Sequence, residues 1–334
     1  MKKTISIAFL DFWGGFDYRV MNLYSILCER YEVIVEDCAD RADYVFYSCF
    51  GSEHWSVPST KIKIFYTAEN ITPDFNACDY AVAFDWLTYG DRFLRLSNAY
   101  GPICAWKNTF SHIENRKVLP KIEFCSFVVS NSHADELRTQ LFYKLSQYKK
   151  VDSGGRFMNN IGGPVKDKFE FDSRHKFSIC CENASQAGYT TEKLYQAFAA
   201  GTIPIYWGDP KVCEIFNERA FVNVASYKSI DDVIDVVANI DNDDTLYKEM
   251  LKQPIFLNPE QEKYNVQIEK LRVFLYNIFD QDLEHAMRYS RHNTHFAYQN
   301  KMAEVIKMSK MSTKQLLALR MVEMIHSLRN KIKR

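Results

Sequence analysis

Two adjacent charged residues in the middle of the chain, Glu192 and Lys193, are the first candidates for chemistry. Residues 177–181 and 202–207 are short apolar runs typical of buried strands, and the pattern over 191–200 predicts a helix between them. The pair therefore falls in the first turn of that helix, where the helix dipole favours a carboxylate and opposes a cation. Helix N-termini also offer free N–H groups to phosphates. Lys193 thus fits a bound diphosphate, although a solvated lysine beside a first-turn acid explains the same pattern.

The loop in front of this helix is polar. Glu182, Asn183 and Ser185 follow the first of the two strands, and the helix is expected to be capped by Thr190 or Thr191. Because a strand, a helix and a second strand follow one another here, the segment predicts one right-handed β-α-β unit.

Two more charged residues follow predicted strands earlier in the chain. Glu69 comes after the strand predicted over 62–67, at the carboxyl end where α/β domains place reactive groups. Arg138 lies on a helix that follows a strand predicted over 127–130. A guanidinium is always charged and suits bidentate contact with phosphate. Taken alone, Glu69 is better explained as a structural or solvated loop acid and Arg138 as a surface arginine.

These residues need a scaffold, and the alternation of strands and helices predicts parallel sheets with covered faces. Two α/β lobes facing a cleft are the expected architecture, with ligands at the carboxyl ends of the strands. The pair Gly154-Gly155 indicates a boundary, which gives lobes at 1–152 and 153–285 and a helical tail at 286–334. Strands are predicted over 5–12, 31–36, 44–48, 62–67 and 80–84, and helices over 19–30, 229–239, 244–251 and 266–279.

The last part of the chain is basic and amphipathic. Residues 301–334 hold nine Lys or Arg against two Glu, and apolar residues recur at helical spacing among them. A basic amphipathic helix can lie on an anionic membrane surface. Docking on this protein or on a second subunit explains the pattern equally well. The apolar residues are Leu317, Met321, Ile325, Leu328 and Ile332, and the basic ones around them include Lys314, Arg329, Lys331, Lys333 and Arg334.

Bulk composition excludes several classes of protein. Lys plus Arg and Asp plus Glu number 42 each, whereas a nucleic-acid-binding domain shows a basic excess. Neither a signal peptide nor an apolar run of about 18 residues is present. The nine cysteines are scattered without a CxxC pair, which is typical of a reducing compartment. A cytoplasmic protein is therefore predicted, with the tail at the inner face of the cytoplasmic membrane as an option.

Four segments together resemble the α-1,3-fucosyltransferase family in its bacterial branch. The most specific part is Asn-Ala-Ser, followed by Tyr-x-Thr-Glu-Lys and then Gly-Thr-Ile-Pro-Ile-Tyr-Trp-Gly. The resemblance covers most of the chain and implies the two-lobed GT-B fold, with the acceptor glycan in the first lobe and GDP-fucose in the second. The segments are FYTAEN (65–70), FDWLTYGDRFLR (84–95), SFVVSN (126–131) and CENASQAGYTTEKLYQAFAAGTIPIYWGDP (181–210).

The resemblance also implies roles for single residues. Glu69 would be the general base on the acceptor hydroxyl, and Glu192 would contact the fucose. Ala68 departs from the glycine that relatives often carry there, the loop at 187–188 varies among relatives, and the acceptor-facing residues 12–15 match less well. The donor would be held by Arg138 at the diphosphate and by Asn183, Tyr189 and Lys193.

The expected reaction is inverting transfer of fucose to a hydroxyl, O3 of an N-acetylglucosamine-containing glycan such as a lipopolysaccharide O-chain or a Lewis-type structure. The expected partners are GDP-fucose and that glycan. A transferase of the same fold with another sugar or linkage, and a sugar-binding protein without turnover, remain alternatives. A nicotinamide dehydrogenase is disfavoured because no GxGxxG turn follows the first strand, and a P-loop is absent.

No metal or other cofactor is predicted. The triplet Asp241-Asn242-Asp243 matches the Asp-x-Asp pattern of metal-dependent sugar transferases. It lies in an acidic turn before a predicted helix, so a capping turn is expected there instead. Lys193 and Arg138 would supply the positive charge that a metal ion otherwise brings to a diphosphate.

Overall fold

The first of two parallel sheets is built from the N-terminal part of the chain. The computed structural model describes residues 2–101, 103–116, 120–312, 315 and 321. All five strand pairings in this sheet are parallel, and the strand order is β2-β1-β3-β4-β5-β6. The central strands are buried along their whole length, as expected when both faces of a parallel sheet are covered. The strands are β1 (Thr4–Leu10), β2 (Glu32–Val35), β3 (Tyr44–Tyr47), β4 (Ile62–Tyr66), β5 (Tyr80–Ala83) and β6 (Phe93–Arg95).

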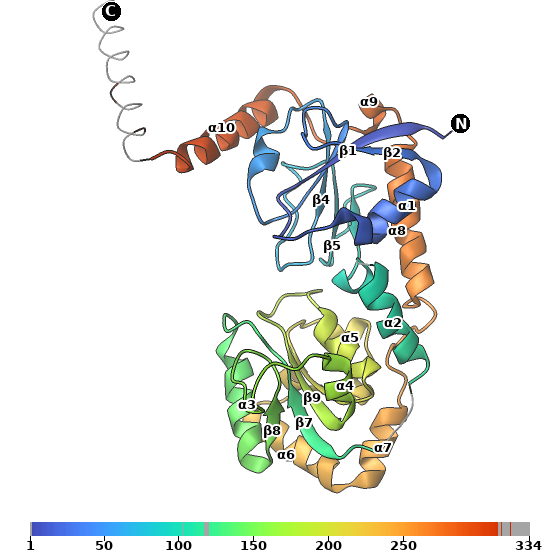
Figure 1. The fold of residues 1–334 in the computed structure, drawn as a ribbon, viewed down its shortest axis with the longest axis vertical. Coiled ribbons are helices and arrows are strands. Elements are labelled where there is room, and N and C mark those ends of the chain that lie inside the picture. The colour runs from blue at the N-terminus through green and yellow to red at the C-terminus, as the bar shows by residue number, and fades with distance from the viewer. Residues whose placement is uncertain (1, 102, 117–119, 313–314, 316–320, 322–334) are drawn as a thin grey trace, which may run out of the picture.

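The second sheet follows and forms the lower lobe in Figure 1. Its strand order is β11-β10-β9-β7-β8, again with every pairing parallel. Helices α3 (Glu136–Tyr148), α6 (Ile230–Asn242) and α7 (Asp244–Lys252) share a hydrophobic core with this sheet. The strands are β7 (Glu123–Phe127), β8 (Val151–Ser153), β9 (His175–Cys181), β10 (Ile203–Trp207) and β11 (Val222–Asn223).

The predicted boundary at residue 152 is wrong. Strand β7, helix α3 and strand β8 all belong to the second sheet, because β7 pairs with both β8 and β9. The glycine pair is also not a linker. A side chain at Gly155 would collide with the backbone of Val129, so glycine is needed there for close packing inside the second lobe. The change of lobe occurs between β6 and β7, through helix α2 (Ile103–Glu114).

The chain also returns to the first lobe before residue 285, so the second lobe ends earlier than predicted. Helix α8 (Tyr264–Phe279) packs against α1 (Asn22–Arg30) on the first sheet. Its last residue, Phe279, is fully buried, with its ring centroid 4.2 Å from that of Tyr44. Figure 1 shows α2 and α8 on the same side of the molecule, and Phe110 of α2 packs on Tyr264 at the start of α8, with ring centroids 5.7 Å apart. The two lobes are therefore connected by two crossings rather than one.

The segment after α9 (Leu283–Ala286) is tied to the first lobe. The hydroxyl of Tyr80 donates to the carbonyl of Ala286 at 2.8 Å, and Arg291 forms an ion pair with the buried Asp79 at 3.0 Å. The prediction that a separate tail begins at residue 286 is therefore wrong for residues 286–291, which are bound to the first lobe.

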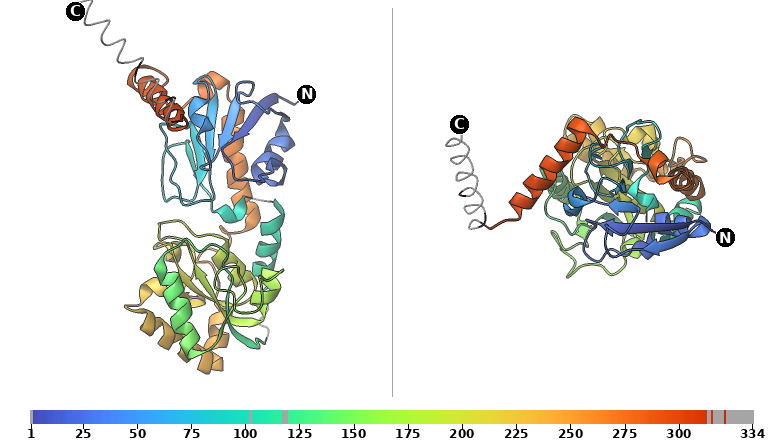
Figure 2. Two further views of the ribbon diagram at one scale, coloured as in Figure 1. Left: turned by 60° about the vertical axis from the view of Figure 1, so that its left-hand side comes forward. Right: turned by 90° about the horizontal axis from the view of Figure 1, so that it is seen from above.

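Helix α10 (Asn293–Ser309) rests on the short 3-10 helix η2 (Glu53–Ser56) and then extends away from the lobe (Figure 2). Its described side chains include the exposed apolar residues Phe296, Tyr298, Val305 and Met308. Most of the predicted amphipathic tail, including Lys314, Leu317, Ile325, Leu328 and Ile332, lies outside the described residues. Within the described part of the chain, no helix is both long and apolar enough to cross a membrane.

Candidate active site between the lobes

Loops that follow strands of both sheets contact each other where the two lobes adjoin, a region called the interlobe gap below. The loop at 182–191, which follows β9, lies against loops that follow β4 and β5. The amide of Gln186 donates to the hydroxyl of Thr72 at 3.2 Å, and the Phe84 and Tyr189 rings pack edge to face with centroids 5.1 Å apart. The structure therefore assembles a site from both lobes at the position where α/β folds bind ligands.

Glu69 lies on the first lobe's side of this gap. It follows β4 through Thr67, whose hydroxyl accepts the backbone N–H of Glu69 at 3.0 Å. The side chain of Glu69 is exposed. The neighbouring Asn70 has a buried side-chain oxygen without a hydrogen-bond partner. An exposed carboxylate beside the interlobe contacts can accept a proton from a bound substrate.

Tyr189 shows that charges from both lobes converge here. Burial raises the pKa of its phenol, and the positive charge of Lys193 acts against that rise. Three carboxylates add to it: Glu182, Glu69 and Glu192. Glu69 comes from the first lobe and the other charged groups from the second. The structure thus brings together four of the residues predicted from the sequence, namely Glu69, Tyr189, Glu192 and Lys193.

Lys193 has a counter-ion within the protein, which the sequence argument missed. Its ammonium group lies 2.9 Å from Glu182 and donates to the Thr191 hydroxyl at 3.1 Å. The cation in the first turn of α5 (Glu192–Ala199) is therefore explained without a bound anion. Burial acts to lower the pKa of Lys193, but Glu182 and then Glu192 outweigh it and raise that pKa. Thr191 is the N-cap residue of α5, but the expected capping by its side chain is wrong. Its hydroxyl donates to Glu182 and accepts no N–H of the helix.

Arg138 is a buried cation without an acidic partner among the described residues. It is 1% exposed, and burial lowers its pKa. One terminal nitrogen donates to the side-chain oxygen of Asn183 at 3.2 Å and the other to the backbone carbonyl of Asn131 at 2.6 Å. Its Nε has no partner. Neutral acceptors orient this guanidinium and leave its charge uncompensated, which suits an anionic ligand.

Asp209 is a second structural carboxylate that the sequence did not reveal. It is 3% exposed and accepts the backbone N–H of Gly188 at 2.8 Å and of Lys211 at 2.7 Å. It also accepts the hydroxyl of Thr190 at 2.9 Å. Asp209 thus fixes the second half of the 182–191 loop. The only sequence signal was its place in the Gly-Asp-Pro turn that ends β10.

An exposed aromatic side chain, Trp86, flanks the site on the loop after β5. The Arg95 guanidinium carbon lies 3.9 Å from its ring centroid, and the Lys211 ammonium nitrogen lies 5.3 Å from it. Trp86 is 41% exposed despite these contacts. Because Lys211 belongs to the second lobe, this cation–π cluster is a further contact across the gap.

The three residues of the Asp-x-Asp triplet make structural contacts. The expected capping role is confirmed for Asp243 alone, because Asp241 and Asn242 are the last two residues of α6. Asp241 is 7% exposed and forms ion pairs with Lys149 at 3.0 Å and Lys176 at 2.9 Å. Asp243 caps α7 by accepting the backbone N–H groups of Thr245 and Leu246. Neither carboxylate lies in the interlobe gap.

One group of side chains with metal-ligand chemistry occurs in the described part of the chain. Nε2 of the buried His175 lies 2.9 Å from a carboxylate oxygen of Glu123 and 3.3 Å from one of Asp152. Lys150 and Arg174 face these two carboxylates and compensate their charge. Glu123 and His175 begin their strands, so the cluster lies at the opposite end of the second sheet from the candidate site.

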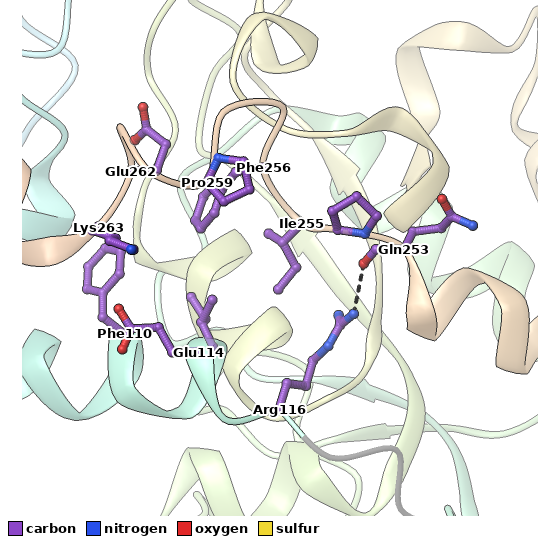
Figure 3. A pocket seen from close by; sticks show the side chains of 11 residues that line it. Phe110, Glu114, Arg116, Gln253, Ile255, Phe256, Pro259, Glu262 and Lys263 are labelled. Carbon is purple, nitrogen blue, oxygen red and sulfur yellow. Dashed lines mark hydrogen bonds between the residues drawn. The ribbon is translucent and has the colours of Figure 1, made fainter.

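A cavity of about 310 Å³ lies where the chain crosses between the lobes (Figure 3). It is bounded by α2 and by residues 253–263, and Arg116 at its wall donates to the carbonyl of Gln253 at 3.1 Å. None of the predicted site residues lines it. The cavity belongs to the crossing between lobes and not to the candidate active site.

Comparison with known proteins gives the same family for both lobes. Residues 7–100 match the family described as the N-terminal domain of alpha-(1,3)-fucosyltransferase FucT, and residues 118–275 match the C-terminal domain of glycosyltransferase family 10 (fucosyltransferase). The chain is 31% identical over 318 residues to alpha-(1,3)-fucosyltransferase FucT of Helicobacter pylori. It is 31% identical over 157 residues to putative fucosyltransferase R654 of Acanthamoeba polyphaga mimivirus.

The matches cover unequal shares of the two relatives. The first covers 83% of this chain and 66% of the H. pylori protein, and the second covers 43% and 26%. This chain therefore corresponds to about two thirds of one relative and about a quarter of the other.

Solved structures agree with the fold. A crystal structure of an alpha1,3-fucosyltransferase is similar with a TM-score of 0.70 and 29% identity, over 84% of this chain and 91% of that one. A structure of an alpha1,3-fucosyltransferase with GDP-fucose is similar with a TM-score of 0.66 over 82% and 91%. The predicted GT-B architecture of two facing α/β lobes is confirmed.

The role of Asp209 can be tested by removing its acceptor atoms. In Asp209→Ala the buried N–H of Gly188 and the buried hydroxyl of Thr190 lose their acceptor. Each unsatisfied buried donor costs about 1–3 kcal/mol, so the free energy of unfolding should fall by about 2 kcal/mol or more. Asp209→Asn keeps a carbonyl oxygen and should lose less. Urea denaturation of the three proteins measures this, and wild-type stability in Asp209→Ala would contradict the assignment.

Proposed function

Because the chain belongs to the fucosyltransferases of glycosyltransferase family 10, we propose that it transfers L-fucose from GDP-fucose to a hydroxyl of a glycan acceptor. The observation that carries the proposal is the contact between loops of the two lobes, of Thr72 with Gln186 and of Phe84 with Tyr189. The charges of Glu69 from the first lobe and of Lys193 and Glu192 from the second all act on Tyr189 there. A base and a leaving-group site that face each other across a gap are what transfer between two bound substrates requires.

The proposed chemistry is one displacement with inversion at the anomeric carbon. The acceptor oxygen forms a bond to that carbon as the bond to the β-phosphate oxygen breaks, and GDP leaves. Glu69 takes the hydroxyl proton, a contribution of roughly 10²–10⁴-fold for a well-placed base. Because the transition state is oxocarbenium-like, the ring carries positive charge, which the nearby carboxylate of Glu192 can stabilise. A β-linked donor thus gives an α-linked product.

Two cations are proposed to meet the diphosphate. Arg138 offers an uncompensated charge, oriented by Asn183 and Asn131. Lys193 offers an ammonium group at the start of α5. With both cations present, the charge that develops on GDP can be stabilised without a metal ion. This supports a mechanism without a metal cofactor.

The first lobe is proposed to hold the acceptor. Large apolar side chains are exposed on the loops that follow its strands, the same edge of the sheet from which Glu69 extends. Aromatic rings of this kind can pack on the apolar face of a sugar while leaving its hydroxyls free. The proposed acceptor is an N-acetylglucosamine-containing glycan, such as a lipopolysaccharide O-chain or a Lewis-type structure, modified at O3. The exposed side chains are Phe50, Ile71, Trp86, Leu87 and Tyr89.

We also propose that the protein works in the cytoplasm, with residues 301–334 at a membrane surface or against a second subunit. Eight described cysteines are free thiols, which supports a reducing compartment. The exposed apolar side chains of α10 give this end of the chain a surface that a bilayer or another subunit can cover.

The base assignment predicts that Glu69→Gln abolishes transfer but leaves GDP-fucose binding intact. The amide keeps the shape of the side chain but cannot take the proton, so kcat should fall by roughly 10²-fold or more. A mass-spectrometric assay with GDP-fucose and a panel of glycans measures transfer, and calorimetry with GDP measures binding. Glu53→Gln, another exposed acid of the first lobe, is the matched control.

Near-normal turnover in Glu69→Gln would show that another group is the base. Transfer of a different sugar by the wild-type protein, or GDP-fucose binding without transfer to any acceptor, would instead contradict the proposed activity.

Removal of divalent metal is predicted to leave transfer unchanged. Arg138 and Lys193 supply the positive charge, so dialysis against EDTA should lower kcat by less than about twofold. The assay is repeated with added Mg²⁺ or Mn²⁺. Complete loss with EDTA that is reversed by metal would contradict this mechanism.

Removal of residues after Ser312 is predicted to affect attachment more than catalysis. The shortened protein keeps both sheets and α10, so kcat should stay close to that of the full chain. Sedimentation with anionic vesicles measures membrane binding, and light scattering measures assembly. If the shortened protein matches the full chain in both measurements, the proposed role of the tail is wrong.

A further inference from the structure

A carboxylate without a role in the proposed reaction lies directly behind the donor side of the gap. Glu182 follows β9 and is fully buried. Its Oε1 accepts the backbone N–H of Thr191 at 2.7 Å, and its Oε2 accepts the Thr191 hydroxyl at 2.7 Å and the Lys193 ammonium at 2.9 Å. Three donors from the start of α5 therefore converge on one acid.

The surrounding backbone leaves a defined space for this side chain. Gly208, at the end of β10, has φ +156°, and a side chain there would approach Cγ of Glu182 to 2.4 Å. Glycine is thus required at 208 because Glu182 lies over it. The N–H of Glu182 also donates to the carbonyl of Trp207 at 2.8 Å, which holds its backbone beside the same turn. The carboxylate is fixed from two sides.

Burial of this charge has an energetic penalty, so its retention calls for a reason. Burial raises the pKa of Glu182, while Lys193 and then Thr191 act in the opposite direction. A buried ion pair often stabilises a protein no more than apolar side chains of the same size. The N–H of Thr191 needs an acceptor, but a neutral side chain would satisfy it. A neutral side chain, however, would not hold the Lys193 ammonium in place by an ion pair.

The geometry leaves Lys193 with one donor for a ligand. An ammonium has three N–H groups, and two of them face Glu182 and Thr191. Glu192 is 3.8 Å away, beyond hydrogen-bond distance. The side chain of Lys193 is 18% exposed, so its third N–H can meet a ligand in the gap. A lysine on a flexible stem is thereby held in one orientation.

We propose that Glu182 is a positioning residue that holds the Lys193 ammonium charged and aimed at the leaving diphosphate. The inference rests on the proposed function and assigns different roles in it to Arg138 and Lys193. Arg138, which has no acidic partner in the described structure, attracts the diphosphate in the ground state. Lys193 is already neutralised by Glu182, so its interaction grows mainly as negative charge develops on the departing oxygen. Interactions that strengthen in the transition state raise kcat more than they lower KM.

The first test is Glu182→Gln, which keeps the shape and loses the charge. We expect kcat to fall roughly 10- to 100-fold while the KM for GDP-fucose changes by less than about threefold. Loss of folded protein alone would lower the active fraction, so activity is divided by the fraction of protein that binds GDP in calorimetry.

The second readout is the pH dependence of GDP binding. In the wild-type protein the raised pKa of Lys193 keeps the ammonium charged, so this residue adds no loss of affinity as the pH rises. In Glu182→Gln burial is opposed mainly by Glu192, and the pKa of Lys193 falls. GDP affinity should then weaken from about pH 7 to about pH 9 relative to wild type. In Glu182→Gln/Lys193→Arg the guanidinium stays charged, and the extra weakening should disappear.

Two neighbouring threonines give a matched control, and they keep the test decisive if Glu182→Gln does not fold. Thr191→Val removes the hydroxyl shared by Glu182 and Lys193, whereas Thr190→Val removes the hydroxyl bound to Asp209. Both lose one buried hydroxyl, so similar losses of thermal stability are expected. Only Thr191→Val should lower kcat, because only that hydroxyl bonds to both Glu182 and the Lys193 ammonium.

The outcomes separate this inference from the proposed function. If wild-type protein transfers fucose, Glu182→Gln keeps the wild-type pH dependence and Thr191→Val keeps the wild-type kcat, Glu182 is only structural. The inference is equally overturned if kcat in Glu182→Gln falls no further than the folded fraction. If the wild-type protein neither binds GDP nor transfers fucose, the proposed function itself is wrong.

Discussion

The loop at 182–191 must keep a single shape between two lobes, and two buried carboxylates impose that shape. Glu182 binds the last residue before α5, and Asp209 binds Gly188 and Thr190. The loop would otherwise be a polar connection with many conformations. Because its backbone donors are satisfied by acids at the ends of β9 and β10, its geometry is set by the second sheet. Tyr189, Asn183 and the start of α5 depend on that frame.

The charges in the gap are divided into compensated and uncompensated groups. Lys193 has Glu182 as an internal partner, while Arg138 has only the neutral oxygens of Asn183 and Asn131. A site with both cations unpaired would be expensive to keep folded without ligand, and one with both neutralised would attract no anion. The arrangement found here lies between these limits. It accounts for the oriented amides around Arg138 and for the acid behind Lys193.

The loops after the strands of the first lobe expose several large apolar side chains as well as the carboxylate of Glu69. Trp86 lies where the two lobes meet, in contact with Arg95 from its own lobe and Lys211 from the other. The two crossings of the chain, through α2 and through the segment before α8, join the lobes on one side (Figure 1). Hydrophobic packing is continuous from the first sheet through α2 to α5, which ties α5 to the first lobe.

The sequence by itself determined the α/β class, the main strands from β1 to β5 and the β9-α5-β10 unit. It also determined the family resemblance from which the roles of Glu69, Arg138 and Lys193 are proposed. Local apolar patterns and a contiguous motif carry that information, and both can be identified in the sequence without knowing which residues are in contact. Shorter strands such as β6, β8 and β11 were not predicted, because two or three residues are too few to show an apolar pattern. Strand β7 begins at Glu123 rather than at 127. Only the tertiary structure decided that residues 123–153 belong to the second sheet, that α8 returns to the first, and that Glu182 is the counter-ion of Lys193. These are pairings between segments distant in the chain. The partners of backbone hydrogen bonds and of buried charges are set by which segments lie close together in the folded chain, and the local sequence pattern does not show which segments these are.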